Sequence, residues 1–208
     1  MSLFVTLEGP EGGGKTTQAR LLAEYLQGQG APVLFTREPG GTTIGDQIRR
    51  TLMDLDNTAM SPRTEFLLFS ASRAQLVEEI IRPHLEAGGV VVCDRYYDAS
   101  LAYQGYGHRL DLDTLRLVTH FATAGLTPDL TLLLDLPVEE GLQRKRREGE
   151  WNRLDAYELA FHQRVRQGYL SLAGADPSRW VLIDAHRPPS EVQEDIRAAV
   201  DARPGRLA

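Results

Sequence analysis

The chain has 208 residues, 42% of them hydrophobic and 25% charged, and its 29 acidic against 23 basic side chains give a formal net charge of −6. These fractions exclude a disordered, fibrous or low-complexity protein and predict one globular domain spanning residues 1–208. The negative charge argues against non-specific binding to nucleic acid, which depends on basic surface.

Five short apolar segments predict β-strands, and segments with helical patterns separate them. In chain order the strands are Leu3–Leu7, Pro32–Thr36, Val90–Cys93, Leu130–Leu134 and Trp180–Ile183. Alternation of strand and helix is typical of a parallel sheet covered on both faces. We therefore expect an α/β fold of three layers, with a five-stranded parallel sheet between helices.

Local signals predict where two of the helices begin. Ser61 followed by Pro62 combines an N-cap with a first-turn proline and predicts a helix that runs toward Pro83. Asp111 similarly predicts the start of a helix that stops near Gly125.

Polar side chains follow each predicted strand directly. They are Glu8, Arg37, Asp94, Asp135 and Asp184. In open α/β sheets, ligands bind beyond the carboxyl ends of the strands, so this edge of the sheet is the predicted site.

Residues 9–16 read GPEGGGKT and match the P-loop pattern G-x-x-x-x-G-K-[ST] between the first strand and an amphipathic helix. Glycines let backbone N–H groups turn toward phosphate oxygens, Lys15 reaches the β and γ phosphates, and the Thr16 hydroxyl is suited to Mg²⁺. A glycine-rich turn with a solvated lysine is the alternative. The predicted ATP-binding residues are Gly9, Pro10, Glu11, Gly12, Gly13, Gly14, Lys15, Thr16 and Thr17.

A P-loop alone does not identify the reaction. A regulatory GTPase should carry an N-K-x-D motif, which this sequence lacks, and a large ATPase would need a longer chain. A compact phosphotransferase, a nucleotide-dependent ligase or a nucleotide-binding module remain as alternatives.

Five motifs, in order along the chain, resemble those of the bacterial thymidylate kinases. They are LEGPEGGGKTT at 7–17, TREPGGT at 36–42, FSASRAQ at 69–75, DRY at 94–96 and AYQG at 102–105. The P-loop is widespread, but the second, third and fourth motifs together are specific to this family. The resemblance implies a P-loop kinase fold that transfers the γ-phosphoryl group of Mg·ATP to dTMP, and a homodimer.

The chemistry of several residues agrees with a dTMP site. Phe69 and Arg73 lie four residues apart on one predicted helix, so one could stack on a base while the other bonds its edge. Core packing and an ion pair are the respective alternatives. The resemblance implies that these residues hold thymine, that Ser100 and Gln104 meet its polar edge, and that Tyr103 crowds the sugar and favours deoxyribose.

The resemblance also assigns residues to the acceptor phosphate, the sugar and the metal. Glu11 is expected to bind the 3′-hydroxyl, and Arg49 and Arg95 to clamp the acceptor phosphate bidentately. Asp94 is expected to hold Mg²⁺ together with Thr16, with an ion pair to an arginine as the alternative. The full expected dTMP-binding set is Glu11, Glu38, Arg49, Phe69, Arg73, Arg95, Ser100, Tyr103 and Gln104.

A basic segment, 144–153, holds four arginines and one lysine. A solvated helix face is the ordinary interpretation, but a closing lid (about 141–155) would neutralise charge on the transferring phosphoryl group. One branch of the family carries a catalytic arginine in the P-loop where this chain has Gly12, so the lid is expected to supply it. The expected catalytic residues are Lys15, Arg95, Arg147 and Arg153.

Two alternatives to a dTMP kinase stay open at this point. One is a kinase for another pyrimidine monophosphate such as dUMP, and the other is a slow, nucleotide-gated P-loop binding protein. The single cysteine, the lack of a signal-peptide pattern and the lack of an apolar run near the roughly 20 residues of a membrane-spanning helix predict a cytoplasmic protein with no membrane partner.

Overall fold

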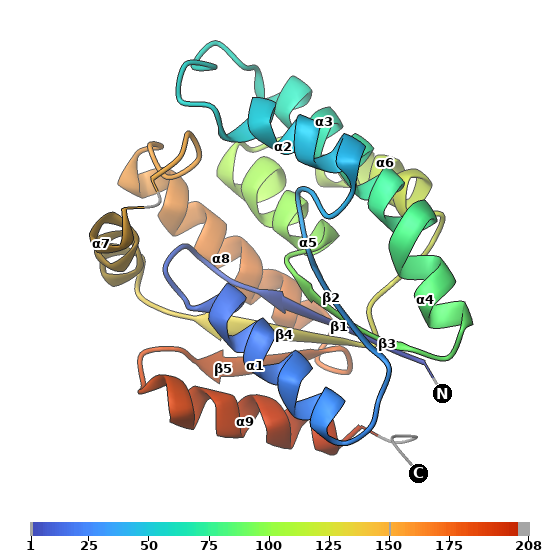
Figure 1. Ribbon diagram of the computed structural model, residues 1–208. Helices are drawn as coiled ribbons and strands as arrows, with labels where there is room; N and C mark the ends of the chain where they lie inside the picture. Colours follow the sequence, from blue (N-terminus) through green and yellow to red (C-terminus); the bar gives the residue numbers. More distant parts are fainter. Residues whose placement is uncertain (1, 150, 204–208) are drawn as a thin grey trace.

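The computed structural model describes residues 2–149 and 151–203. Five parallel strands form one sheet in the order β2-β3-β1-β4-β5 (Figure 1). They are β1 (Leu3–Glu8), β2 (Val33–Arg37), β3 (Val90–Asp94), β4 (Leu130–Asp135) and β5 (Trp180–Asp184). The prediction of a five-stranded parallel sheet is confirmed, and each predicted strand end lies within one residue of the observed one.

Helices cover both faces of the sheet, which confirms the three-layer fold (Figure 1). Side chains alternate between faces along a strand, so Val5 packs in the core cluster that α1 and α9 cover, whereas Phe4 packs toward α3. The helices are α1 (Lys15–Gly28), α2 (Thr43–Met53), α3 (Pro62–Leu76), α4 (Arg82–Glu86), α5 (Tyr97–Ser100), α6 (Leu112–Thr123), α7 (Val138–Glu148), α8 (Leu159–Ala175) and α9 (Pro189–Asp201), with π-helical turns η1 (Val77–Ile81) and η2 (Leu101–Gly107). Among the described residues, no helix is both long and apolar enough to cross a membrane.

The two predicted helix starts are confirmed. The Ser61 hydroxyl accepts a hydrogen bond from the backbone N–H of Thr64 at 3.2 Å, and Pro62 opens α3. Asp111 caps α6 in the same way, and α6 stops just before Gly125. The α3 helix continues through η1 into α4, so the predicted run toward Pro83 is interrupted by a π-helical turn.

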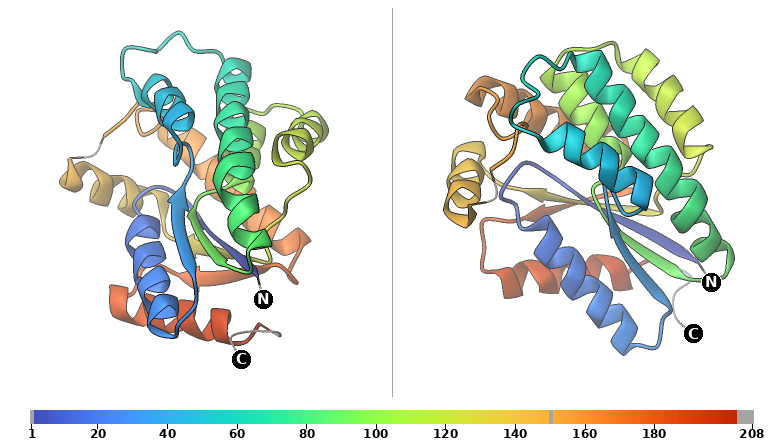
Figure 2. Two further views of the ribbon diagram at one scale, coloured as in Figure 1. Left: turned by 45° about the vertical axis from the view of Figure 1, so that its right-hand side comes forward. Right: turned by 45° about the horizontal axis from the view of Figure 1, so that its top comes forward.

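The helix α7 packs against the loop between β1 and α1, and both views of Figure 2 show it beside this loop. Gly12 in that loop has a φ of +69°, and a Cβ atom there would overlap the backbone oxygen of Gly141 on α7. A side chain at position 12 would therefore push α7 away, so this chain has no room for an arginine there. The basic part of α7 consequently begins one turn from the phosphate-binding loop.

Candidate active site

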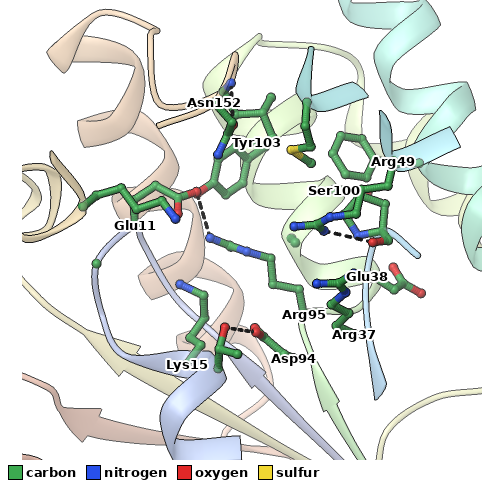
Figure 3. Close-up of a pocket in the computed structure, with 18 of the residues that line it drawn as sticks. Glu11, Lys15, Arg37, Glu38, Arg49, Asp94, Arg95, Ser100, Tyr103 and Asn152 are labelled. Atoms are coloured by element: carbon green, nitrogen blue, oxygen red, sulfur yellow. Dashed lines mark hydrogen bonds and ion pairs between the residues drawn. The ribbon is translucent and has the colours of Figure 1, made fainter. Parts of the chain in front are cut away.

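A cavity of about 520 Å³ lies at the carboxyl ends of β1, β2 and β3 (Figure 3). The predicted edge of the sheet is therefore the one that carries the cavity. The ends of β4 and β5 do not line it, and Asp135 at the end of β4 accepts two hydrogen bonds from Arg166, at 2.8 and 2.7 Å.

Most of the site residues predicted from the sequence line the cavity. Those lining it are Glu11, Gly12, Gly14, Lys15, Thr16, Thr17, Glu38, Arg49, Phe69, Asp94, Arg95, Ser100, Tyr103 and Gln104. Gly9, Pro10, Gly13, Arg73, Arg147 and Arg153 do not line it.

The P-loop is folded around the side chain of Lys15. Its ammonium donates to the backbone oxygen of Pro10 at 2.6 Å, and α1 begins after Gly14 in the left-handed conformation. Burial, reinforced by the positive charge of Arg95, lowers the pKa of Lys15 to about 8. Next to it the Thr16 hydroxyl donates to the carboxylate of Asp94, so two oxygen ligands suited to a divalent cation lie together.

Arg95 and Glu11 form the centre of the cavity (Figure 3). Arg95 Nη2 lies 2.9 Å from Glu11 Oε1, and the hydroxyl of Tyr103 donates to the same oxygen at 2.6 Å. Burial acts to raise the pKa of Glu11, but the positive charges of Arg95 and Lys15 outweigh it and lower the pKa to about 2. Glu11 is therefore ionised and acts as a hydrogen-bond acceptor.

The opposite side of the Arg95 guanidinium is held by the backbone of Gly9 and by Tyr169, and the sequence analysis missed Tyr169. Nη1 donates to the backbone oxygen of Gly9 and to the hydroxyl of Tyr169, both at 3.0 Å, and Tyr169 in turn donates to Glu8 at 2.9 Å. Arg95 also has a φ of +67°, a conformation that costs about 1–3 kcal/mol and is found mostly at functional sites. Tyr169 lies 74 residues away on α8, and no local motif links it to Arg95.

The apolar end of the cavity combines one ring with a buried ion pair. Phe69 is only 9% exposed and lines the cavity while packing against Leu52 and Leu154, so it is also a core residue. Behind it Arg73 forms a buried ion pair with Glu38 at 2.7 Å, the alternative that the sequence left open. Burial raises the pKa of Glu38 to about 7, against the opposing charge of Arg73.

The ion pair between Arg73 and Glu38 leaves some hydrogen-bonding atoms of both side chains without a partner in the described chain. Arg73 Nη2 donates to the hydroxyl of Ser100 at 3.0 Å, but Arg73 Nη1 and Glu38 Oε1 are buried with no hydrogen-bond partner among the described residues. Gln104 is in a similar state: its Nε2 donates to Glu65 at 2.7 Å, and its Oε1 is buried without a described partner. Buried polar atoms left unpaired cost free energy, so a ligand that supplied the missing partners would be stabilised at this end of the cavity.

A second cationic wall was only partly predicted. Arg37 at the end of β2, Arg49 on α2 and Arg95 directly after β3 all line the cavity. Arg49 Nη1 donates to the backbone oxygen of Pro39 at 2.9 Å, which orients its guanidinium. Arg37 was part of a recognised motif but had no assigned role, and its place at the carboxyl end of β2 was the signal available for it.

The basic segment contributes differently from the sequence-based prediction. Lys145 lines the cavity, four residues along α7 from Gly141 and therefore on the face turned to the P-loop. Arg147 has an exposed side chain. Arg153 is buried, and its Nη2 lies 2.6 Å from Glu65 Oε2, away from the cavity. Glu150, within the expected lid, lies outside the described residues.

A P-loop beside a chamber lined by arginines, with an apolar end that holds unpaired polar atoms, defines a nucleoside monophosphate kinase-like phosphotransferase. The family model described as thymidylate kinase matches residues 7–196, and the chain belongs to this family. The family indicated by the five sequence motifs is thereby confirmed.

Individual relatives agree with the family assignment. The chain is 57% identical to a thymidylate kinase of Roseiflexus sp. (strain RS-1), over 97% of this chain and 94% of the relative. It is 54% identical to a thymidylate kinase of Deinococcus radiodurans, over 97% of each chain. The crystal structure of thymidylate kinase from Ehrlichia chaffeensis has 31% identity and a TM-score of 0.79, covering 96% of this chain and 98% of that one.

Proposed function

We propose that the protein transfers the γ-phosphoryl group of ATP to the phosphate of dTMP, giving ADP and dTDP. The observation that carries this proposal is one cavity in which the P-loop, four arginines and an apolar end with unpaired polar atoms meet. The thymidylate kinases among its relatives support it.

The two phosphates are expected to meet between Lys15 and Arg95. Lys15 holds the β and γ phosphates of ATP, while Arg49 and Arg95 bind the acceptor phosphate with planar forks. The attacking phosphate oxygen needs no strong general base, so positioning and neutralisation of charge supply most of the rate. Glu11, ionised beside Arg95, accepts a hydrogen bond from the 3′-hydroxyl of the acceptor sugar.

Thymine complements the unpaired atoms at the apolar end. Its carbonyl oxygens accept hydrogen bonds, which suits the free Nη1 of Arg73, and its ring N–H donates, which suits Oε1 of Gln104. Phe69 lines the same end and offers a ring for stacking. Tyr103, bonded to Glu11, stands beside the sugar and disfavours a 2′-hydroxyl.

The hydroxyl of Thr16 and the carboxylate of Asp94 fit a magnesium ion, because both are hard oxygen ligands and they already lie in contact. The bound ion would neutralise charge on the triphosphate. We expect phosphate oxygens and water to complete the coordination of the ion.

The lid is proposed to contribute through Lys145, which lines the cavity and helps to lower the pKa of Glu11. Arg147 and Arg153 stay predictions as catalytic residues. Arg153 would have to leave its ion pair with Glu65 to reach a phosphate.

A homodimer is proposed through the packed pair α3 and α6. Leu117 and Phe121 lie four residues apart on α6 and are 74% and 86% exposed, and Leu67 on α3 is 51% exposed. An exposed apolar face of this kind usually marks an interface. Changing Leu117 to Glu is expected to shift the mass measured by light scattering to that of a monomer. We propose that this dimer acts in the cytoplasm.

The experiment that tests the function is ADP release from Mg·ATP with dTMP, dUMP, UMP, CMP, AMP or GMP, each against a control without acceptor. We expect strong stimulation by dTMP and weaker stimulation by dUMP, because one methyl group discriminates by about 10- to 200-fold. Equal efficiency with dTMP and dUMP would contradict a thymidylate kinase. Turnover that needs no acceptor would instead favour a nucleotide-gated binding protein.

A further inference from the structure

Glu65 on α3 is a fully buried carboxylate that does not line the cavity but contacts Gln104, which does line it. Its Oε1 accepts from Gln104 Nε2 at 2.7 Å and lies 3.3 Å from Nε2 of His108. Its Oε2 accepts from Arg153 Nη2 at 2.6 Å and from the hydroxyl of Tyr157 at 2.9 Å. One carboxylate thus joins Gln104, at the base end of the cavity, to Arg153 in the lid segment and to Tyr157 just after it.

The carboxylate is ionised. Burial acts to raise the pKa of Glu65, but the adjacent His108 and the hydrogen bonds from Gln104 and Arg153 outweigh it and lower the pKa to about 2. An ionised carboxylate only accepts hydrogen bonds.

This restricts the amide of Gln104. The two ends of an amide have nearly the same shape, so packing alone does not decide which end faces a ligand. Because Glu65 accepts, it must face the Nε2 of Gln104, and the Oε1 of Gln104 is the end left for the cavity that Gln104 lines. That oxygen is buried and has no partner in the described part of the chain.

We propose that Glu65 is a positioning residue that sets base specificity: by holding Nε2 of Gln104 it presents an acceptor to the cavity and selects bases with a ring N–H. This inference rests on the proposed phosphorylation of dTMP. Thymine and uracil carry a donor at the ring nitrogen between their carbonyl groups, whereas the corresponding nitrogen of cytosine is an acceptor. Glu65 therefore distinguishes thymine and uracil from cytosine without touching the base.

The substitution Glu65→Gln tests this role, because glutamine keeps the shape but has only one accepting end. Arg153 is permanently charged and can only donate, so it takes that oxygen. The new NH₂ group then faces Gln104, whose amide must turn and present its own NH₂ group to the cavity. A donor now opposes the ring N–H of thymine.

We would measure kcat and KM for dTMP and dCMP in the wild type and in Glu65→Gln. The ratio of kcat/KM for dTMP over dCMP is expected to fall about tenfold or more, chiefly because KM for dTMP rises. Two buried donors that face each other leave both without an acceptor, and the free-energy cost is that of an unsatisfied polar group. A merely structural loss would lower kcat/KM for both acceptors equally and leave the ratio unchanged.

Asp98→Asn provides the matched control. Asp98 is also buried, and it accepts two hydrogen bonds from Arg179, at 2.6 and 3.0 Å. Its substitution likewise weakens a buried ion pair but leaves Gln104 untouched, so the dTMP to dCMP ratio should match the wild type.

The exchange Glu65→Gln with Gln104→Glu restores the pattern and covers the case in which the single variant does not fold. The NH₂ group of residue 65 then donates to the carboxylate at 104, whose second oxygen again offers an acceptor to the base. We expect the dTMP preference to return toward that of the wild type, and a ratio that instead collapses would overturn the inference.

The outcomes separate the two proposals. A wild-type protein that fails to phosphorylate dTMP would overturn the proposed function and this inference with it. A wild type active with dTMP, together with an unchanged ratio in Glu65→Gln, would overturn the role of Glu65 alone.

Discussion

The guanidinium of Arg95 lies 2.9 Å from the carboxylate of Glu11, so a cation at the end of β3 and an anion of the P-loop share the centre of one cavity. This pair explains how a carboxylate can lie in a loop with the sequence pattern of a phosphate-binding loop. Arg95 neutralises Glu11 locally, and Tyr103 fixes its orientation. We therefore expect the negative charge of Glu11 to face the acceptor rather than the triphosphate.

Arg95 depends on its planar fork, since its two terminal nitrogens donate to Glu11, Tyr169 and the backbone of Gly9. Lysine keeps the charge but loses this geometry. We expect Arg95→Lys to lower kcat/KM for dTMP by about 100-fold, as measured by steady-state kinetics. Arg116→Lys, at an exposed ion pair on α6, is the control and should behave like the wild type. Normal activity of Arg95→Lys would remove Arg95 from the acceptor clamp.

Phe69 is expected to stack on the acceptor base, so Phe69→Ala should weaken dTMP binding by about 10- to 100-fold in calorimetry. Its neighbour Phe66 is the matched control, because it is buried on the same helix but does not line the cavity. Both substitutions should lower the free energy of unfolding by about 3–5 kcal/mol. If both variants bind dTMP equally well, Phe69 is a core residue only.

Lys15 gives a pH dependence with a definite sign. Because burial lowers its pKa to about 8, Lys15 in the free enzyme loses its positive charge as the pH rises through that value. The kcat/KM for ATP, which reports the free enzyme, should therefore fall as the pH rises through about 8. Arginine stays charged in this range, so any activity of Lys15→Arg should lack this decline. A wild-type profile that stays flat well above pH 8 would contradict the assignment.

The lid cations are distinguished by comparing kcat with stability. Lys145→Ala is expected to lower kcat by about tenfold or more while the melting temperature stays unchanged, because Lys145 lines the cavity near the surface. Arg153→Ala should instead lower the free energy of unfolding by about 3–5 kcal/mol, because it leaves the buried Glu65 without its cation.

The opposite pattern would restore the sequence-based prediction for Arg153. A large loss of kcat with unchanged stability would mean that Arg153 leaves Glu65 when the lid closes. The same two measurements on Arg147→Ala test whether Arg147 contributes to the transfer.

Local patterns in the sequence were sufficient for the fold and the phosphate-binding loop. Apolar runs that end in a polar residue, such as Val90 to Asp94, predict a parallel strand and its active edge together, because both the burial and the chain direction are local properties. The spacing of glycines before Lys15 likewise predicts a P-loop, since the turn and the helix start lie within a few residues.

Only the tertiary structure decided which charged groups pair with each other and which face the cavity. Arg153 contacts Glu65, 88 residues away, and does not line the cavity. The basic composition of the segment 144–153 had instead pointed to a catalytic role for Arg153 in a lid. Lys145 faces the P-loop because Gly12 lets α7 approach closely. Such choices depend on packing between distant segments, and an arginine in a sequence has the same chemistry whether it meets a phosphate or a buried carboxylate.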